Sequence, residues 1–187
     1  MAKKRGKERP RRLLLFRIFI WFLEILLVVL IAYAASRLFF RTATMQENSM
    51  EPTVSVGDTL LLDKAAYRIH SVRRGDIIAY RNTDNENEVL HLKRVVGLPG
   101  ETIQIVNGQI MINGETYREG RNLPAIIDAG LASEPVTLAD DEYFVLGDNR
   151  NGSQDSRYSS VGNVRNKRVV GKVWFRIRPI RRLGSVG

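Results

Sequence analysis

Residues 102–112 read TIQIVNGQIMI, two short runs of alternating apolar and polar residues on either side of an Asn107-Gly108 dipeptide. Alternation with period two is typical of a half-buried β-strand, and Asn-Gly is the dipeptide that a two-residue type I′ turn favours. The stretch therefore predicts a β-hairpin. A second dipeptide of the same kind, Asn113-Gly114, predicts another turn directly after it.

Short apolar runs that indicate further strands lie on both sides of this hairpin. They cover residues 76–81, 89–96, 143–146 and 172–177. Residues 114–141 are richer in Pro, Gly and acidic residues, so we expect a small loop-rich insertion over about 102–141 that includes the hairpin. No convincing helical periodicity follows residue 41. The sequence thus predicts a mainly β domain built from antiparallel sheets.

The N-terminal part of the chain has a different character. Residues 18–35 read IFIWFLEILLVVLIAYAA, in which Glu24 is the one charged residue. A helix of this length spans about 27 Å, so we expect one transmembrane anchor over residues 13–40. Ala32-Tyr33-Ala34 also fits the exit site of a cleavable signal, but the apolar run exceeds the usual length of about 7–15 residues. An uncleaved anchor is the better interpretation.

The distribution of charge orients this anchor. Of the net charge of +9, residues 1–12 contribute +6, from seven basic residues and one acidic residue. The positive-inside rule then predicts a basic cytoplasmic tail at 1–12 and an extracytoplasmic domain at 41–187, in a single-pass protein of the cell membrane. A basic tail beside an apolar run is a topology signal, so we expect the lipid bilayer as a partner and no nucleic acid.

The residue types exclude several kinds of site. The chain has no cysteine, which excludes disulfides, thiolate metal sites and a cysteine nucleophile. It has two histidines, too few for a histidine-rich metal site. We expect neither a metal nor a cofactor.

Two positions combine chemistry with an unusual setting. Ser49 opens the stretch SMEPT at 49–53, which Pro52 keeps out of helical conformation. Lys93 shares a face of its predicted strand with Val89 and Val95, and such a setting would lower its pKa by desolvation. A neutral amine is a general base that takes the proton of a serine hydroxyl. An edge-strand lysine pointing to water is the alternative for Lys93.

Three motifs together carry a family resemblance. SMEPT at 49–53, KRVVGLPGE at 93–101 and GDNRNGSQDSR at 147–157, in this order behind an N-terminal anchor, resemble the type I signal peptidases, the Ser/Lys proteases of the bacterial secretory pathway. The resemblance implies a membrane-surface serine endopeptidase that removes signal peptides from secreted preproteins at small-x-small sites. It implies that Ser49 is the nucleophile and Lys93 its general base.

The resemblance also implies roles for residues around this pair. Ser153 would help orient the Lys93 amine, and Asp155 and Arg157 would support the site as a structural pair. Met50 would lie near the substrate cleft. These assignments are expectations carried over position by position.

The oxyanion hole is where the sequence departs from the family. The backbone N–H of Ser49 would form one part of it. Some members place a second hydroxyl donor two residues before the nucleophile, where this chain has Glu47. Because a carboxylate does not donate hydrogen bonds, Asn48 is the candidate for the second donor.

Two other functions fit parts of the sequence. A Ser/His protease would use His91, which shares a strand face with Lys93, and Asp155 could orient its imidazole. A membrane-anchored β domain that binds extended peptides without cleaving them is the non-catalytic alternative. Such a domain would be expected to lack Ser49 or Lys93, and both are present.

Overall fold

The computed structural model describes residues 8–83, 85 and 88–186. The chain divides into two compact units, with the boundary between Phe39 and Phe40. The first unit is helix α1 (Glu8–Phe39). Within it, Leu13–Phe39 is a 27-residue stretch long and apolar enough to cross a membrane. Residues 1–7 of the predicted cytoplasmic tail lie outside the described residues.

The second unit is built, in its described residues, from two antiparallel sheets. The larger sheet has eight strands in the order β1-β2-β11-β3-β4-β9-β10, with β12 pairing with β11. Its strands are β1 (Phe40–Thr44), β2 (Thr59–Asp63), β3 (Ile77–Tyr80), β4 (His91–Gly97), β9 (Glu142–Leu146), β10 (Val164–Arg165), β11 (Val169–Arg178) and β12 (Gly184–Ser185). The predicted fold class, mainly antiparallel β after one apolar helix, is confirmed.

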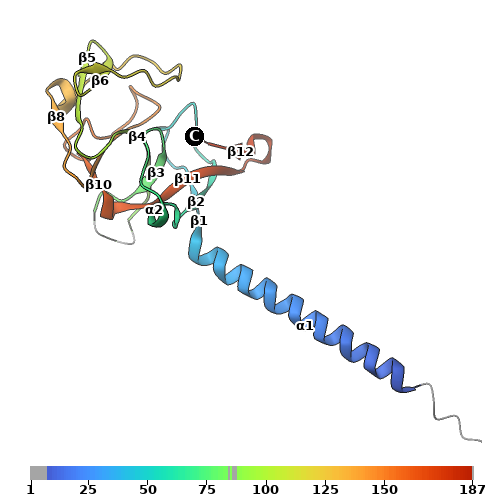
Figure 1. Cartoon of the computed structure of the whole chain (residues 1–187). Coiled ribbons are helices and arrows are strands. Elements are labelled where there is room, and N and C mark those ends of the chain that lie inside the picture. Colours follow the sequence, from blue (N-terminus) through green and yellow to red (C-terminus); the bar gives the residue numbers. More distant parts are fainter. Residues whose placement is uncertain (1–7, 84, 86–87, 187) are drawn as a thin grey trace, which may run out of the picture. The chain divides into compact units, whose positions relative to one another are not determined.

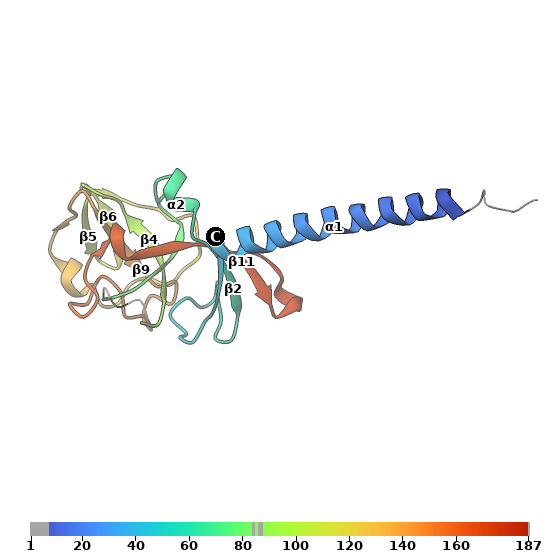
Figure 2. The same ribbon diagram turned by 90° about the horizontal axis from the view of Figure 1, so that it is seen from below.

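The smaller sheet contains the hairpin predicted from the sequence. Its order is β7 (Glu115–Thr116), β6 (Gln109–Ile112), β5 (Thr102–Val106) and β8 (Val136–Thr137). The two turn residues, Asn107 and Gly108, have φ of 50° and 74°, as a type I′ turn requires. Both views place β5 and β6 at the end of the β domain away from β2 (Figures 1 and 2).

Helical structure in the described part of the β domain is limited to short segments. They are α2 (Ala66–Ile69) and the 3-10 turns η1 (Gly130–Ser133), η2 (Asn166–Arg168) and η3 (Ile180–Arg182). The predicted loop at 114–141 contains η1 and the two-residue strands β7 and β8. Strands this short form because longer neighbours offer free edges, which local sequence patterns do not reveal.

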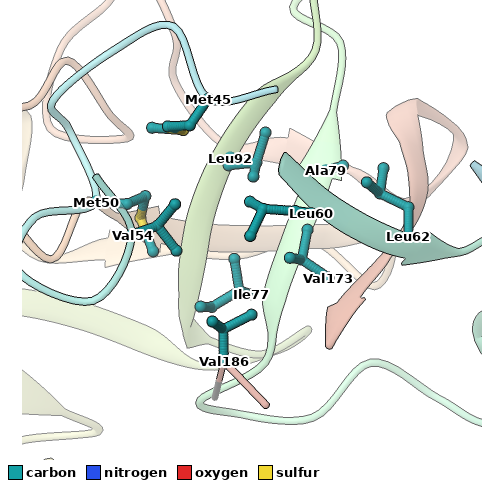
Figure 3. Close-up of a cluster of buried hydrophobic side chains, with 10 residues drawn as sticks. All are labelled: Met45, Met50, Val54, Leu60, Leu62, Ile77, Ala79, Leu92, Val173 and Val186. Atoms are coloured by element: carbon teal, nitrogen blue, oxygen red, sulfur yellow. The ribbon is translucent and has the colours of Figure 1, made fainter. Parts of the chain in front are cut away.

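A buried apolar cluster fixes the loop that joins β1 to β2. Figure 3 shows Met45, Met50 and Val54 of this loop packed with Leu60 of β2 and Leu92 of β4. The complete cluster is Met45, Met50, Val54, Leu60, Leu62, Ile77, Ala79, Leu92, Val173 and Val186. The segment around residue 49 is therefore anchored by its own apolar neighbours.

A second buried cluster leaves no room beside Gly97, the last residue of β4. A Cβ on Gly97 would lie 2.7 Å from Leu138 Cδ1 and 2.8 Å from both Ile103 Cγ1 and Phe144 Cβ. Overpacking of this kind costs about 1–3 kcal/mol. We expect Gly97→Ala to lower the free energy of unfolding by about that amount, measured by urea denaturation in detergent.

Val106→Ala is the matched control, because its side chain is 41% exposed on the neighbouring sheet. Its unfolding free energy should change by no more than about 0.5 kcal/mol. Equal stability of the two variants would contradict the close packing around Gly97.

Candidate active site

Ser49 lies in a tight turn of the loop between β1 and β2. The backbone N–H of Glu51 donates to Asn48 O at 3.2 Å, and that of Val54 donates to Met50 O at 2.9 Å. The apolar residues that follow Ser49 point into the core, and Ser49 itself is 3% exposed. The hydroxyl is thus held on a rigid, nearly buried turn.

Lys93 projects from β4, which pairs with β3 on one side and with β9 on the other. It is therefore not an edge-strand lysine, and its side chain is 1% exposed. Lys93 Nζ donates to Ser49 Oγ at 2.9 Å. Burial lowers the pKa of Lys93, while the nearby carboxylates of Glu47 and Asp155 act in the opposite direction.

The polar loop at 147–157 fixes the backbone of the nucleophile. The Asn149 N–H donates to Ser49 O at 3.0 Å, and Asn149 Nδ2 donates to Asn48 O at 3.2 Å. A Cβ on Gly147 would lie 2.2 Å from Ser153 Oγ and 2.4 Å from Ser49 O. Glycine at 147 therefore lets this loop approach the serine turn closely.

Asp155 and Arg157 form the buried ion pair that the resemblance implies. Arg157 Nε donates to Asp155 Oδ1 at 2.8 Å, and Nη2 donates to Oδ2 at 2.9 Å. Asp155 also accepts from the Gly147 N–H at 3.0 Å, and Arg157 donates to Arg150 O at 2.6 Å. The pair thus ties both ends of the loop together. Its supporting role in catalysis stays a prediction.

The other predicted residues have different settings. Ser153 Oγ is buried and has no hydrogen-bond partner within the described part of the chain, so its contact with the lysine amine stays a prediction. Met50 is fully buried in the apolar cluster, away from solvent. Asn48 is exposed, and its backbone oxygen accepts the hydrogen bond from Asn149 Nδ2.

A buried ion pair behind the site was not singled out from the sequence. Arg94 Nε donates to Asp148 Oδ1 at 2.7 Å and Nη2 to Oδ2 at 2.6 Å, and Thr53 Oγ1 also donates to Asp148. Burial raises the pKa of Asp148, but the hydrogen bonds and charge of Arg94 outweigh it, and the pKa lies below its ordinary value. An arginine on an apolar strand is the signal that would have pointed to a buried partner.

The contacts of Glu47 were also not predicted from the sequence. Its Oε2 lies 3.4 Å from both Lys93 Nζ and Ser49 Oγ, and its Oε1 lies 3.2 Å from His91 Nδ1. Partial burial acts to raise the pKa of Glu47, but the charges of Lys93 and His91 lower it. A carboxylate thus touches both members of the Ser49–Lys93 pair.

A cavity of about 230 Å³ opens beside Ser49. It is lined by Glu47, Asn48, Ser49, Asn82, His91, Gly152, Gln154 and Val161. Among the residues that the structure describes, no cluster of His, Asp and Glu is arranged to hold a metal ion. A serine hydroxyl bound to a buried amine at the edge of a cavity is the arrangement of serine hydrolases that use lysine in place of histidine.

Comparison with known proteins identifies the family of the chain. Residues 18–178 match the family described as signal peptidase, peptidase S26. Signal peptidase I of Leptolyngbya laminosa is 38% identical over 146 residues, which cover 74% of this chain and 69% of the relative. Signal peptidase I of Bacillus caldolyticus is 34% identical over 191 residues, which cover 96% and 94%. The chain belongs to the signal peptidase family, and it is a serine endopeptidase that cleaves signal peptides.

A crystal structure of a signal peptidase I from Enterococcus faecalis V583 is also similar. It is 31% identical in sequence, with a TM-score of 0.42. The alignment covers 55% of this chain and 97% of the Enterococcus chain.

Proposed function

We propose that Ser49 and Lys93 are the catalytic dyad with which this protein removes signal peptides from secretory preproteins. The observation that carries the proposal is the 2.9 Å contact between Lys93 Nζ and Ser49 Oγ, in a pair whose side chains are both nearly buried. A water-excluded amine is the lysine environment in which the neutral form is favoured.

The reaction follows from this contact. Neutral Lys93 takes the hydroxyl proton as Ser49 Oγ attacks the scissile carbonyl, and the backbone N–H of Ser49, with Asn48 as the second donor, stabilises the oxyanion. The Lys93 ammonium then gives its proton to the leaving amine, which departs and leaves an acyl-enzyme. Water, deprotonated by the same amine, hydrolyses the ester and restores Ser49.

The resemblance assigns supporting roles to the surrounding residues. Ser153 orients the lysine amine, and the Asp155–Arg157 pair keeps the loop at 147–157 in place. Met50 lies near the substrate cleft, where it anchors the turn that carries Ser49 in the apolar cluster. Pockets for small side chains at the first and third positions before the cut select small-x-small sites in the preprotein.

The anchor gives the reaction its place in the cell. In this proposal residues 1–12 are cytoplasmic, 13–40 cross the membrane, and 41–187 form the catalytic domain on the outer face. The eight residues from Arg41 to Ser49 reach at most about 28 Å when extended. The nucleophile therefore stays close to the bilayer surface, where the cleavage sites of preproteins emerge.

The Ser/His alternative has weaker support, because His91 Nδ1 contacts Glu47 and no contact between His91 and Ser49 is found among the described side chains. We expect His91→Ala to cleave a preprotein with an Ala-x-Ala site within about tenfold of the wild-type rate at alkaline pH, because a base would contribute about 10²–10⁴-fold. The assay uses the full chain in detergent, with product masses locating the cut after the second alanine. Loss of cleavage in His91→Ala, together with retained cleavage in Lys93→Ala, would overturn the proposed dyad.

A further inference from the structure

Glu47 occupies an unexpected position for a carboxylate in a serine protease. Its side chain is 45% exposed, and its Oε2 reaches the two nearly buried partners, Lys93 Nζ and Ser49 Oγ, at 3.4 Å each. Each carboxylate oxygen thus has its own contacts, since Oε1 faces His91 Nδ1 at 3.2 Å. The carboxylate is placed between the dyad on one side and an imidazole on the other.

The charge of Glu47 opposes the proposed chemistry in the free enzyme. An ionised carboxylate at this distance favours the ammonium form of Lys93, which cannot accept a proton from Ser49. It also accepts a hydrogen bond from the Ser49 hydroxyl, and this directs the proton away from the lysine. The contacts describe a resting state in which Lys93 is held as an ammonium group paired with Glu47.

The same carboxylate conflicts with the tetrahedral intermediate. The oxyanion is carried by the carbon that becomes bonded to Ser49 Oγ, and a carboxylate that stayed in contact with Oγ would repel this negative charge. Glu47 is half exposed, so it is free to move once a peptide covers the serine. His91, whose ring lies 23% exposed at the cavity, already binds its other oxygen and offers a partner away from the dyad.

We propose that Glu47 is a substrate-displaced clamp, a positioning residue that holds Lys93 and Ser49 in the free enzyme and shifts toward His91 when a preprotein binds. The inference rests on the proposed dyad. In this proposal, Glu47 sets the pH at which Lys93 of the free enzyme loses its proton and can act as a base. This role also explains how a carboxylate is tolerated two residues before the nucleophile.

Several titratable groups surround the clamp. Lys93 and His91 come from β4, and Tyr80 comes from β3, where it pairs with His91. Glu88 Oε1 lies 4.0 Å from His91 Nε2, and Asp155 of the loop at 147–157 acts on both Lys93 and Tyr80. Of these groups, Lys93 and His91 touch Glu47 directly, so the charge of Glu47 acts mainly on them.

The test compares pH profiles of wild type and Glu47→Gln, in the full chain in detergent with a preprotein bearing an Ala-x-Ala site. The acidic limb of kcat/KM reports the free enzyme, and that of kcat reports the substrate complex. With the carboxylate gone, Lys93 loses its proton more easily, so we expect the limb of kcat/KM to move to lower pH by about one unit. The variant is then up to about tenfold faster than wild type at acidic pH. The limb of kcat should stay at its wild-type pH, because in the substrate complex Glu47 has already moved away from Lys93.

Two variants serve as controls. Glu47→Asp keeps the charge and should keep the limb of kcat/KM close to that of wild type. Glu88→Gln removes a neighbouring carboxylate that contacts His91 but is not among the groups acting on Lys93, and should leave the limb in place.

An unmoved limb of kcat/KM in Glu47→Gln, or the same shift in Glu88→Gln, would overturn the clamp. An equal shift in the acidic limb of kcat would show that substrate does not displace Glu47 from Lys93. Retained activity in Lys93→Ala would instead disprove the dyad, so the two failures are distinguishable.

Discussion

Replacing Lys93 by alanine is expected to reduce kcat/KM for preprotein cleavage by about 10⁴-fold, and Ser49→Ala should cost at least as much. The amine at 2.9 Å from Ser49 Oγ acts three times in the proposed cycle, as base, as acid and as activator of water. In wild type the rate should rise with pH as Lys93 loses its proton. Because burial lowers the pKa of Lys93, the rate should begin to rise at a pH below the usual pKa of a lysine, 10.5. Initial rates of product formation on gels or by mass spectrometry measure both effects.

Lys172→Ala is the matched control for this loss. Lys172 belongs to β11 of the same sheet, its side chain is 37% exposed, and it pairs with Asp76 at 2.6 Å. We expect the control variant to retain activity, and circular dichroism to show that Lys93→Ala keeps its fold. Cleavage by Lys93→Ala at the wild-type rate would contradict the role of Lys93.

Removing one partner of the buried Arg94–Asp148 pair is expected to destabilise the domain strongly. Asp148→Ala leaves the Arg94 guanidinium, 1% exposed, without its carboxylate. An uncompensated buried charge costs about 3–5 kcal/mol, and urea denaturation in detergent would measure the loss. Thr53, four residues after Ser49, also loses a hydrogen-bond acceptor, so activity should fall with stability.

The double variant Arg94→Met, Asp148→Leu is the control for this prediction. Replacing both members of a buried ion pair by apolar residues is often nearly neutral, so the double variant should recover most of the loss. The pair's stabilisation should be present above about pH 4 and disappear as the pH falls through the lowered pKa of Asp148. A double variant as unstable as Asp148→Ala would contradict this account.

Strands with alternation and good turn residues were predictable from the sequence. β5 and β6 have the predicted bounds, because the Asn107-Gly108 turn fixes both ends of the hairpin. β11 begins at Val169, three residues before the predicted start, because Val169 and Gly171 pair with β3. β2 was missed although Leu60 and Leu62 are buried alternately in its TLLLD sequence, a pattern that would have indicated a strand.

The contact between Ser49 and Lys93 was predictable from the motifs. The order of the three motifs pointed to Ser49 and Lys93, and the structure brings their side chains together across 44 residues of sequence. The contacts of Glu47 and of Arg94 were not predicted, because they depend on how β4 packs against two separate loops. Sequence spacing shows which face of a strand a residue occupies, but it does not show what lies opposite that face.

The neighbours Lys93 and Arg94 make the contact between Lys93 and Ser49 sensitive to insertions and deletions within β4. They project to opposite sides of the strand, where Lys93 meets Ser49 and Arg94 meets Asp148. A residue gained or lost within β4 before Lys93 would shift the strand by one position and turn each of these side chains to the opposite side. An insertion would then place Leu92 opposite Ser49 and Lys93 opposite Asp148, whereas a deletion would place the permanently charged guanidinium of Arg94 opposite Ser49 and Val95 opposite Asp148. Point substitutions elsewhere in β4 preserve this division, so the register of β4 is under stronger constraint than most of its residue identities.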